Sequence, residues 1–420
     1  MNRKALAWAF YDFANTIFSM NVLSLYFPLF VSVDLGLGDS YVSFANSGSM
    51  LLAGFLLPIL GTISDERGGK ILFLLLFTLS CATATIFIGI FANLYLPTGV
   101  IISFMIANLS YQIALGFYNT FLEKVSSQAT IGKISGIGTA LGYLGSIAGL
   151  VLVAPFNTGK FLGHTMGFIK PGGRSATFIP TALLFLIFSI PIFIFLWEWD
   201  FRKSTLGFTK QIALAFARVI NSLKDTRAYP GVRRFLVAKF FYEEGIQTAI
   251  IFMGIYADKV VGLSDSIKVT FFVVATTGSV IGSILSGIIT DRLGHKKSLS
   301  IFLAGWVISL MALVILKGIT SFVVLGVIIG ALLGSVWTSA RPLLVELVPA
   351  SSLGQFFGLY GLVGKTASVF GPLLWATVLA LTSKLGTATS YRFAVLSLAI
   401  MILSGLIILQ GMNVGERKSK

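Results

Sequence analysis

Residues 61–70 read GTISDERGGK, and residues 287–296 read GIITDRLGHK. Each stretch has an Asp followed three residues later by Gly and five residues later by Lys, and the two stretches lie 226 positions apart. Each also separates two long apolar segments of the chain. A repeat at this spacing indicates a duplicated chain, in which both halves contain the same order of segments.

The apolar segments on either side of these stretches are typical of membrane helices. Hydrophobic residues make up 56% of the 420 residues and charged residues only 11%, whereas soluble domains have about 25% charged residues. Roughly 235 apolar residues are close to the roughly 240 that about twelve bilayer-spanning helices require. The composition therefore predicts an integral membrane protein and excludes a soluble enzyme, a disordered chain and a disulfide-linked secreted domain.

Hydropathy over a window of about nineteen residues predicts twelve spans. The first six are 8–33, 42–63, 71–91, 99–121, 134–155 and 178–199, and the next six are 235–257, 269–289, 299–316, 322–340, 356–382 and 393–411. Spans of this length without strict alternation exclude a β-barrel. We therefore predict an all-α protein with twelve transmembrane helices in two pseudo-symmetric six-helix bundles.

The positive charge of the chain follows the membrane topology. An even number of spans puts both termini on one side, and roughly 21 of the 31 Lys and Arg residues fall on that side. This bias predicts cytoplasmic termini, in the inner membrane if the protein is bacterial. It also accounts for the net charge of +15 without nucleic acid as a partner.

The longest predicted cytoplasmic loop divides the chain into two bundles. It covers residues 200–234, between the bundles at 1–199 and 235–420. Within this loop Ile212, Phe216 and Val219 fall on one helical face, while Lys210 and Arg218 lie toward the other. This pattern predicts an amphipathic linker helix on the inner leaflet.

Two further pairs of stretches support the duplication. Phe10-Tyr11-Asp12 in the first span matches Phe241-Tyr242-Glu243 in the seventh span, 231 residues later. A ladder of small residues in the fifth span matches one in the eleventh span at a single offset of 222: Gly132, Gly136, Gly142, Ser146 and Gly149 with Gly354, Gly358, Gly364, Ser368 and Gly371. The halves are thus expected to be parallel repeats related by an axis along the membrane normal.

With these features the sequence resembles the major facilitator superfamily over almost its whole length. Residues 61–70 and 287–296 are similar to that superfamily's signature between helices two and three of each half. An Asp near a helix end can accept hydrogen bonds from backbone amides of a facing helix, while basic residues pair with carboxylates or lipid phosphates. We expect such contacts to hold the outward-facing state closed on the inside. The expected gating residues are Asp65, Arg67, Lys70, Asp291, Arg292 and Lys296, with Glu123, Arg341 and Glu346 near the cytoplasmic ends of spans.

A narrower resemblance comes from five stretches of residues. They are WAFYDFAN at 8–15, YNTFL at 118–122, GKISG and ALGYLG at 132–136 and 140–145, and YEEGIQT at 242–248. Together they resemble the UMF1 branch of the superfamily, which is similar to the Atg22-type vacuole effluxers. The resemblance implies efflux of amino acids from the vacuole in fungal members.

Carboxylates inside the spans are the candidate coupling groups. A charge near the bilayer centre costs about 2.5 to 3.5 kcal/mol on insertion scales, so it must face water or a partner. Asp12 lies about one turn inside the first span, where it is either a carboxylate near water at a helix end or a functional group. Glu243 and the neighbouring Glu244 point about 100° apart on a helix, so only one of them is expected to face a cavity.

Amides and a lysine accompany these carboxylates. Asn15 follows Asp12 by three residues and Gln247 follows Glu243 by four, so each pair shares a helical face that suits an ammonium or hydroxyl group. Lys365 aligns with Tyr143 on the small-residue ladders, and it either forms a structural ion pair or binds Glu243 or a substrate carboxylate. The aromatic and amide residues Tyr118, Asn119 and Tyr143 are further candidates for lining a cavity.

We therefore predict a secondary transporter that moves a small polar solute, such as an amino acid or a related zwitterion, by alternating access. A proton or another ion is the expected coupling partner, because a carboxylate that loses water on closure holds a proton more readily. The chain lacks a P-loop of the form G-x-x-x-x-G-K-[ST], so gradients must supply the energy. We expect a monomer in contact with membrane lipid, without cofactor or metal. The alternatives are an exporter of amphipathic compounds or lysolipids, and a membrane-embedded enzyme or receptor.

Overall fold

The structure is a computed structural model, and it describes residues 2–37, 39–127, 129–161, 164–165, 170–198, 229, 231–263, 265–316, 318–367 and 370–412. Nearly all of these residues are helical. The exception with paired strands is a short hairpin of β1 (Lys160–Phe161) and β2 (His164–Thr165) after the fifth span. The all-α prediction is therefore confirmed for the described residues.

The helices of the first half follow the predicted spans. The first span is a continuous helical segment of α1 (Arg3–Phe18), the π-helical η1 (Ser19–Tyr26), α2 (Phe27–Leu29) and η2 (Phe30–Asp34). It is followed by α3 (Asp39–Arg67), α4 (Lys70–Asn93), α5 (Pro97–Thr120), the short α6 (Leu122–Val125), α7 (Ile131–Thr158), the 3-10 turn η3 (Arg174–Thr177) and α8 (Phe178–Phe195).

The second half repeats this order. It contains α10 (Val232–Tyr256) with η4 (Ala257–Val261), α11 (Asp265–Leu293), α12 (His295–Ile315) and α13 (Ile319–Leu347). After the turn η5 (Ala350–Ser352) come α14 (Leu353–Ala367), α15 (Phe370–Thr382), η6 (Ser383–Leu385) and α16 (Thr387–Gln410). The predicted eleventh span, 356–382, thus corresponds to two described helices, α14 and α15.

Among the described residues, nine helices are long and apolar enough to cross a membrane. The other three predicted spans are the first, the seventh and the eleventh. The first contains the π-helical segments η1 and η2, and the seventh carries Lys239, Glu243 and Glu244 within one helix. Residues 368–369 of the eleventh span lie outside the described part of the chain, between α14 and α15. Charged residues within membrane helices are typical of transporter sites.

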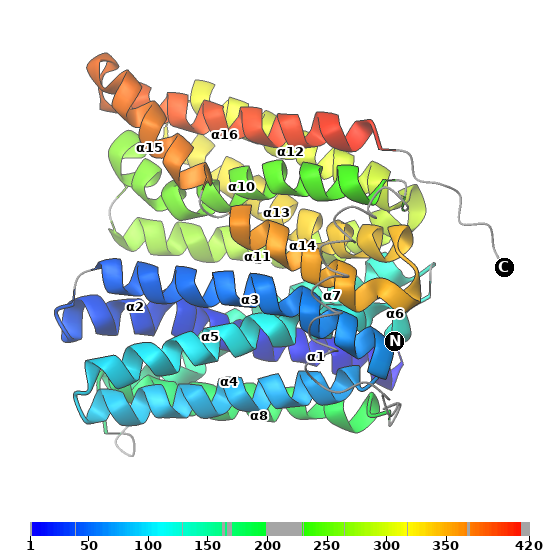
Figure 1. The fold of residues 1–420 in the computed structure, drawn as a ribbon. Coiled ribbons are helices and arrows are strands. Elements are labelled where there is room, and N and C mark those ends of the chain that lie inside the picture. The colour runs from blue at the N-terminus through cyan, green and yellow to red at the C-terminus, as the bar shows by residue number, and fades with distance from the viewer. Residues whose placement is uncertain are drawn as a thin grey trace. The chain divides into compact units, whose positions relative to one another are not determined.

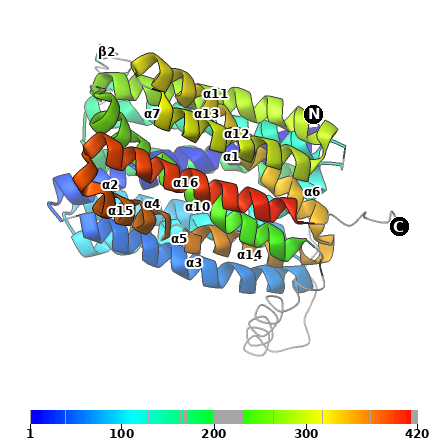
Figure 2. The same ribbon diagram turned by 90° about the horizontal axis from the view of Figure 1, so that it is seen from above.

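Contacts between helices divide the chain into two compact units. Unit 1 comprises residues 1–125, 141–219 and 351–358, and unit 2 comprises residues 126–140, 220–350 and 359–420. In unit 1, α4 runs alongside α5 and α8 (Figure 1). In unit 2, α10 lies along α16 (Figure 2). Each unit includes the beginning of one helix from the other half of the sequence, namely α14 in unit 1 and α7 in unit 2.

The predicted bundle boundaries at residues 199 and 235 stay a prediction. Residues 199–228 lie outside the described part of the chain, and with them the predicted amphipathic helix of the linker.

Aromatic packing holds the core of unit 1 together. The rings of Phe27 and Phe104 stack with centroids 3.5 Å apart, and Phe18 packs on Tyr111 with centroids 4.9 Å apart. The hydroxyl of Tyr11, which is fully buried, shares a hydrogen bond of 2.6 Å with Thr78 of α4. Since lipid gives no hydrophobic drive for helix association, such close packing and interhelical hydrogen bonds fix the bundle.

An ion pair in the loop region should contribute little to stability. Arg174 of η3 binds Asp34 of η2 at 2.5 Å, but 28% and 35% of the two side chains are exposed. Solvent and salt screen such a pair, so Arg174→Ala should lower the free energy of unfolding by less than about 1 kcal/mol. Thermal unfolding at low and high salt checks this, and a loss of several kcal/mol would contradict it.

Candidate functional site

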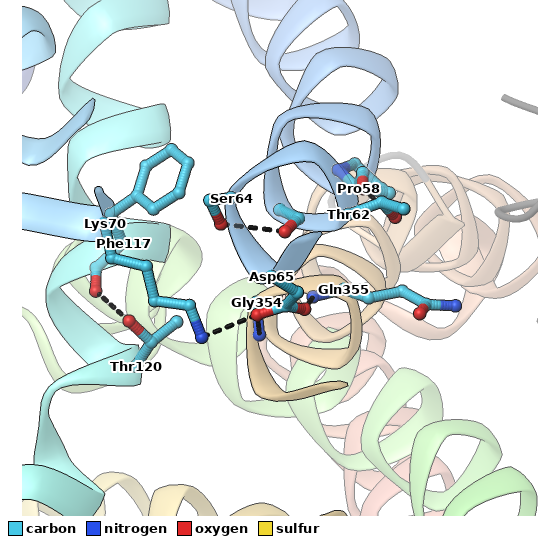
Figure 3. A network of polar contacts seen from close by, with 10 residues as sticks. Pro58, Thr62, Ser64, Asp65, Lys70, Phe117, Thr120, Gly354 and Gln355 are labelled. Carbon is cyan, nitrogen blue, oxygen red and sulfur yellow. Dashed lines mark hydrogen bonds and ion pairs between the residues drawn. The ribbon is translucent and has the colours of Figure 1, made fainter. Parts of the chain in front are cut away.

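Asp65, near the end of α3, joins α3 to the first turn of α14 within unit 1 (Figure 3). Its carboxylate accepts hydrogen bonds from the backbone N–H of Gly354 at 3.3 Å and of Gln355 at 3.0 Å. Lys70 of α4 forms an ion pair with the same carboxylate at 2.5 Å, and only 8% of the Asp65 side chain is exposed. The N–H groups of a first helical turn have no partner in their own helix, and the helix dipole favours an anion there.

Local sequence allows this close approach. Gly68 and Gly69 have φ of +71° and +70° and form the turn that brings Lys70 back to Asp65. A Cβ atom at Gly354 would lie 2.9 Å from both Asp65 Oδ1 and the carbonyl oxygen of Gly61. A Cβ atom at Gly358 would lie 2.6 Å from the Cα of Pro58. The glycines of the eleventh span therefore permit backbone contact between α3 and α14.

Asp291 makes the equivalent contact within unit 2. Its carboxylate, near the end of α11, accepts hydrogen bonds from the N–H groups of Gly132 at 2.7 Å and Lys133 at 2.8 Å, in the first turn of α7. A Cβ atom at Gly287 would lie 2.7 Å from the carbonyl oxygen of Gly132, so α11 and α7 are also in backbone contact. The predicted hydrogen bonds from Asp to a facing helix are thus present twice, and we call each a carboxylate clamp. The gating role of the clamps stays a prediction.

Lys296 of the second repeat binds backbone carbonyl groups. Its Nζ atom donates to the carbonyl oxygens of Gln410 at 2.9 Å and Met412 at 2.6 Å, while the predicted pairing with a carboxylate or a lipid phosphate stays a prediction. The last carbonyls of α16 have no partner within the helix, so they attract a cation. Lys70, by contrast, does pair with a carboxylate, that of Asp65.

The remaining gating candidates lie around these loops or at helix ends. Glu346, at the end of α13, bonds to the Nδ1 atom of His295 at 2.6 Å, beside a cavity of about 570 Å³ that Lys296 also lines. The structure places Arg67, Glu123 and Arg341 in half-buried positions and Arg292 in an exposed one. Their gating roles stay predictions.

Asp12 and Asn15 are buried in unit 1. Asp12 is 5% exposed, which contradicts the interpretation of a carboxylate near water at the helix end. A Cβ atom at Gly142 of α7 would lie 3.5 Å from its Cγ atom, so the ladder glycine leaves it room. Asn15 is 1% exposed, and neither end of its amide has a hydrogen-bond partner among the described residues. A buried amide without partners is costly and suggests that water or a ligand binds there.

Glu243 has a partner that sequence reasoning missed. It forms an ion pair with Lys239, one turn earlier on α10, and both side chains are buried. The ammonium of Lys239 lies 4.0 Å from the centre of the Tyr360 ring of α14. The spacing of four residues between Lys239 and Glu243 was the available signal, because residues at i and i+4 lie on one helical face.

Glu244 is directed to a different neighbour. Its carboxylate accepts a hydrogen bond from the N–H of Gly371, in the first turn of α15. Glu244 is 1% exposed. The prediction that the two adjacent carboxylates point in different directions is therefore correct, and the expectation that only one of them faces a cavity stays a prediction.

The other predicted substrate residues are distributed over both units, and each is described within its own unit. Tyr118 is buried, stacks on Trp8 with centroids 4.6 Å apart and on Tyr11, and its carbonyl accepts a hydrogen bond from the Trp8 indole. Asn119 is buried. The structure leaves Tyr143 and Gln247 half-buried, and the side chain of Lys365 lies outside the described part. Within the described ranges, no three His, Cys, Asp or Glu side chains form a group that could hold a metal ion.

Comparison with known families identifies the chain. The model of the family described as "Vacuole effluxer Atg22 like" matches residues 38–420. The chain belongs to this family. The Atg22-like chain is also 26% identical over 415 residues to an uncharacterized MFS-type transporter, YxiO, of Bacillus subtilis, covering 96% of this chain and 93% of that protein. It is 25% identical to autophagy-related protein 22 of Yarrowia lipolytica, covering 71% of this chain and 54% of the fungal protein.

Solved structures show the fold of this Atg22-like protein. It superposes on the human organic anion transporter MFSD10 with a TM-score of 0.72 at 15% identity, covering 97% of this chain and 98% of that one. It also superposes on the transporter FucP in its outward conformation with a TM-score of 0.72 at 13% identity, covering 98% of each chain. The predicted major facilitator fold and the Atg22-like branch are both confirmed. The protein is therefore a multi-pass membrane transporter of this superfamily and not an enzyme.

Proposed function

We propose that this Atg22-like transporter moves amino acids or related zwitterions by alternating access, coupled to protons through Glu243. The observation that carries the proposal is the buried ion pair of Glu243 and Lys239 in a membrane helix. An ionisable pair at such a position is costly to bury and is typical of ion and substrate pathways. The family description, vacuole effluxer, supports a solute as cargo.

In this proposal the carboxylate clamps control access from the cytoplasm. We place both termini there, as the distribution of Lys and Arg favours. The Asp65 and Asp291 clamps each hold a helix of one sequence half to a helix of the other, so both must loosen when the inside opens. Each Asp accepts hydrogen bonds from two backbone N–H groups. Two bonds to one carboxylate fix the orientation of the facing helix in the closed arrangement.

The test is flux of an amino acid panel into reconstituted vesicles with and without a pH gradient. Wild type should accumulate at least one amino acid when the gradient is present. Glu243→Gln keeps the size of the side chain but cannot lose a proton, so it should abolish the gradient-driven part and reduce the accumulation ratio to about one. Glu198→Gln is the matched control, because Glu198 is an exposed carboxylate paired with Lys124 at 2.6 Å.

Two outcomes would overturn the proposal. Equal gradient-driven flux in wild type and Glu243→Gln would show that Glu243 is not the coupling carboxylate. Absence of flux for every amino acid, with transport of an amphipathic compound or a lysolipid instead, would favour the exporter alternative. The 37 Phe residues of the chain make that second panel worth measuring.

A further inference from the structure

Lys239 of α10, in unit 2, is a buried cation within the predicted seventh span. It is 1% exposed, and its counterpart in the first half, 231 positions earlier, is Trp8. Trp8 donates a hydrogen bond of 3.1 Å to the carbonyl of Tyr118 and needs no counter-charge. A buried lysine, in contrast, is stable only with an anion close by. The duplication therefore gave one half a neutral packing residue and the other half a cation.

The surroundings of Lys239 come from two facing pairs of residues. On α10, Lys239 and Glu243 are one turn apart, and on α14, Tyr360 and Gly364 are also one turn apart. The ring of Tyr360 covers the ammonium at 4.0 Å. A Cβ atom at Gly364 would lie 3.0 Å from Glu243 Oε1 and 3.2 Å from Lys239 Nζ. The ion pair thus lies against an aromatic face and bare backbone of α14.

The other charged groups on α10 or on the helices around it are described here with the residues that they contact or follow. Glu244 is bonded to Gly371 of α15. Arg341 of α13 interacts electrostatically with Tyr360, and Lys365 follows Gly364 on α14. Along α16 the charged residue is Arg392, which interacts with Tyr256 at the far end of α10, about 20 Å from Glu243 at 1.5 Å per residue. Among the described contacts, Glu243 is the carboxylate that forms an ion pair with Lys239.

We propose that Lys239 binds the carboxylate of the substrate, and that Glu243 takes the place of that carboxylate when the site is empty. When Glu243 gains a proton, its charge disappears and the buried ammonium requires another anion, which a substrate carboxylate supplies. When Glu243 loses the proton, its carboxylate binds Lys239 again and displaces the substrate. One proton is thus bound and released with each substrate molecule. The inference rests on the proposed function, to which it adds the group that recognises the substrate.

The experiment compares the amino acid of the panel with the highest flux and the carboxamide of the same amino acid. Wild type should prefer the acid by about 100-fold in kcat/KM, because the amide leaves the ammonium of Lys239 without an anion. Lys239→Gln should reduce this preference to less than about threefold. Glu243→Gln, which keeps the ammonium, should retain the preference and lose the effect of the pH gradient. If the ion pair were merely structural, the two variants would not separate the preference for the acid from the dependence on the pH gradient.

Three further variants keep the test decisive. Lys239→Gln combined with Glu243→Gln replaces the pair by two neutral side chains, so no unpaired charge is buried if the single variant fails to fold. Lys239→Arg keeps the cation and should restore the preference for the acid. Lys384→Gln removes an exposed cation in η6 and should behave as wild type.

The inference is overturned if the double variant still prefers the acid as strongly as wild type does. It is also overturned if Lys239→Gln and Glu243→Gln lose preference and gradient dependence together. A wild type that transports amino acids without any effect of the pH gradient refutes the proposed coupling, and with it the exchange of Glu243 for the substrate carboxylate on Lys239. A wild type that moves no amino acid refutes the proposed function and the inference with it.

Discussion

Asp65→Ala should be among the most damaging single substitutions in this transporter. It removes one carboxylate that binds Gly354, Gln355 and Lys70, and it leaves the ammonium of Lys70, 16% exposed, without this anion. Breaking a largely buried ion pair costs about 3–5 kcal/mol. We therefore expect a fall of this size in the free energy of unfolding, seen as a lower thermal midpoint in detergent.

Two further variants at this site separate the effect of the carboxylate charge on stability from the effect of its hydrogen bonds. Asp65→Asn keeps one acceptor oxygen but loses the charge, so its effect should be smaller than that of Asp65→Ala. Asp65→Ala combined with Lys70→Met should recover part of the loss, because no unpaired ammonium remains. Midpoints that are unchanged in all three variants would mean that the clamp does not hold α3 to α14.

Loss of the Asp65 carboxylate should also increase access to this region from the cytoplasmic side. If the Asp65 clamp closes the cytoplasmic side, its loss should expose the end of α3 to a thiol reagent from that side. Cys81 is the single cysteine of the chain and is buried, so a cysteine introduced at the buried Ser64, next to Asp65, reports the opening. The labelling rate at this position should rise severalfold when Asp65→Asn is added to the cysteine variant.

Gly371→Val should be the other severe change. A Cβ atom at this position would lie 2.5 Å from Glu244 Oε2 and 3.1 Å from the carbonyl oxygen of Glu244, and it would also collide with Thr248 Oγ1. Overpacking of this kind costs about 1–3 kcal/mol. The loss of the hydrogen bond from the N–H of Gly371 to a buried carboxylate adds about 1.5–3 kcal/mol. We expect little folded protein, measured as monodisperse yield and thermal midpoint.

Two matched variants show whether the hydrogen bond itself matters. Glu244→Ala removes the acceptor without a clash, and it should lower the midpoint by part of the amount seen for Gly371→Val. Gly48→Ala adds a Cβ atom that would meet only the flexible end of Met105, at 3.3 Å, so it should be nearly neutral. Full stability of Glu244→Ala would contradict the role of Glu244 as the partner of the first turn of α15.

Much of the fold could be predicted because lipid imposes simple rules. Backbone groups in a bilayer must bond within their own segment, so apolar runs of about twenty residues become helices. The repeated Asp, Gly and Lys spacing at 61–70 and 287–296 then gave the order of the two halves. The π-helical segments of the first span were not predicted, because average hydropathy is insensitive to backbone hydrogen bonding within a helix.

The candidate site was predictable only in part. The polar residues of the spans were found because burying a charge in lipid is costly, and Lys239 was overlooked as a partner although it lies four residues before Glu243. The burial of Asp12 and the contact of Lys296 with the end of α16 depend on neighbouring helices, which hydropathy does not contain.

The sequence by itself determined that this protein is a duplicated, twelve-helix membrane transporter with carboxylates at matching positions of its halves. Only the tertiary structure decided what those carboxylates bind. Asp65 meets the N–H of Gln355, 290 positions away, and Glu244 meets the N–H of Gly371, 127 positions away. Such pairs involve backbone groups that every residue possesses, so no pattern of side chains identifies them until the helices pack against each other.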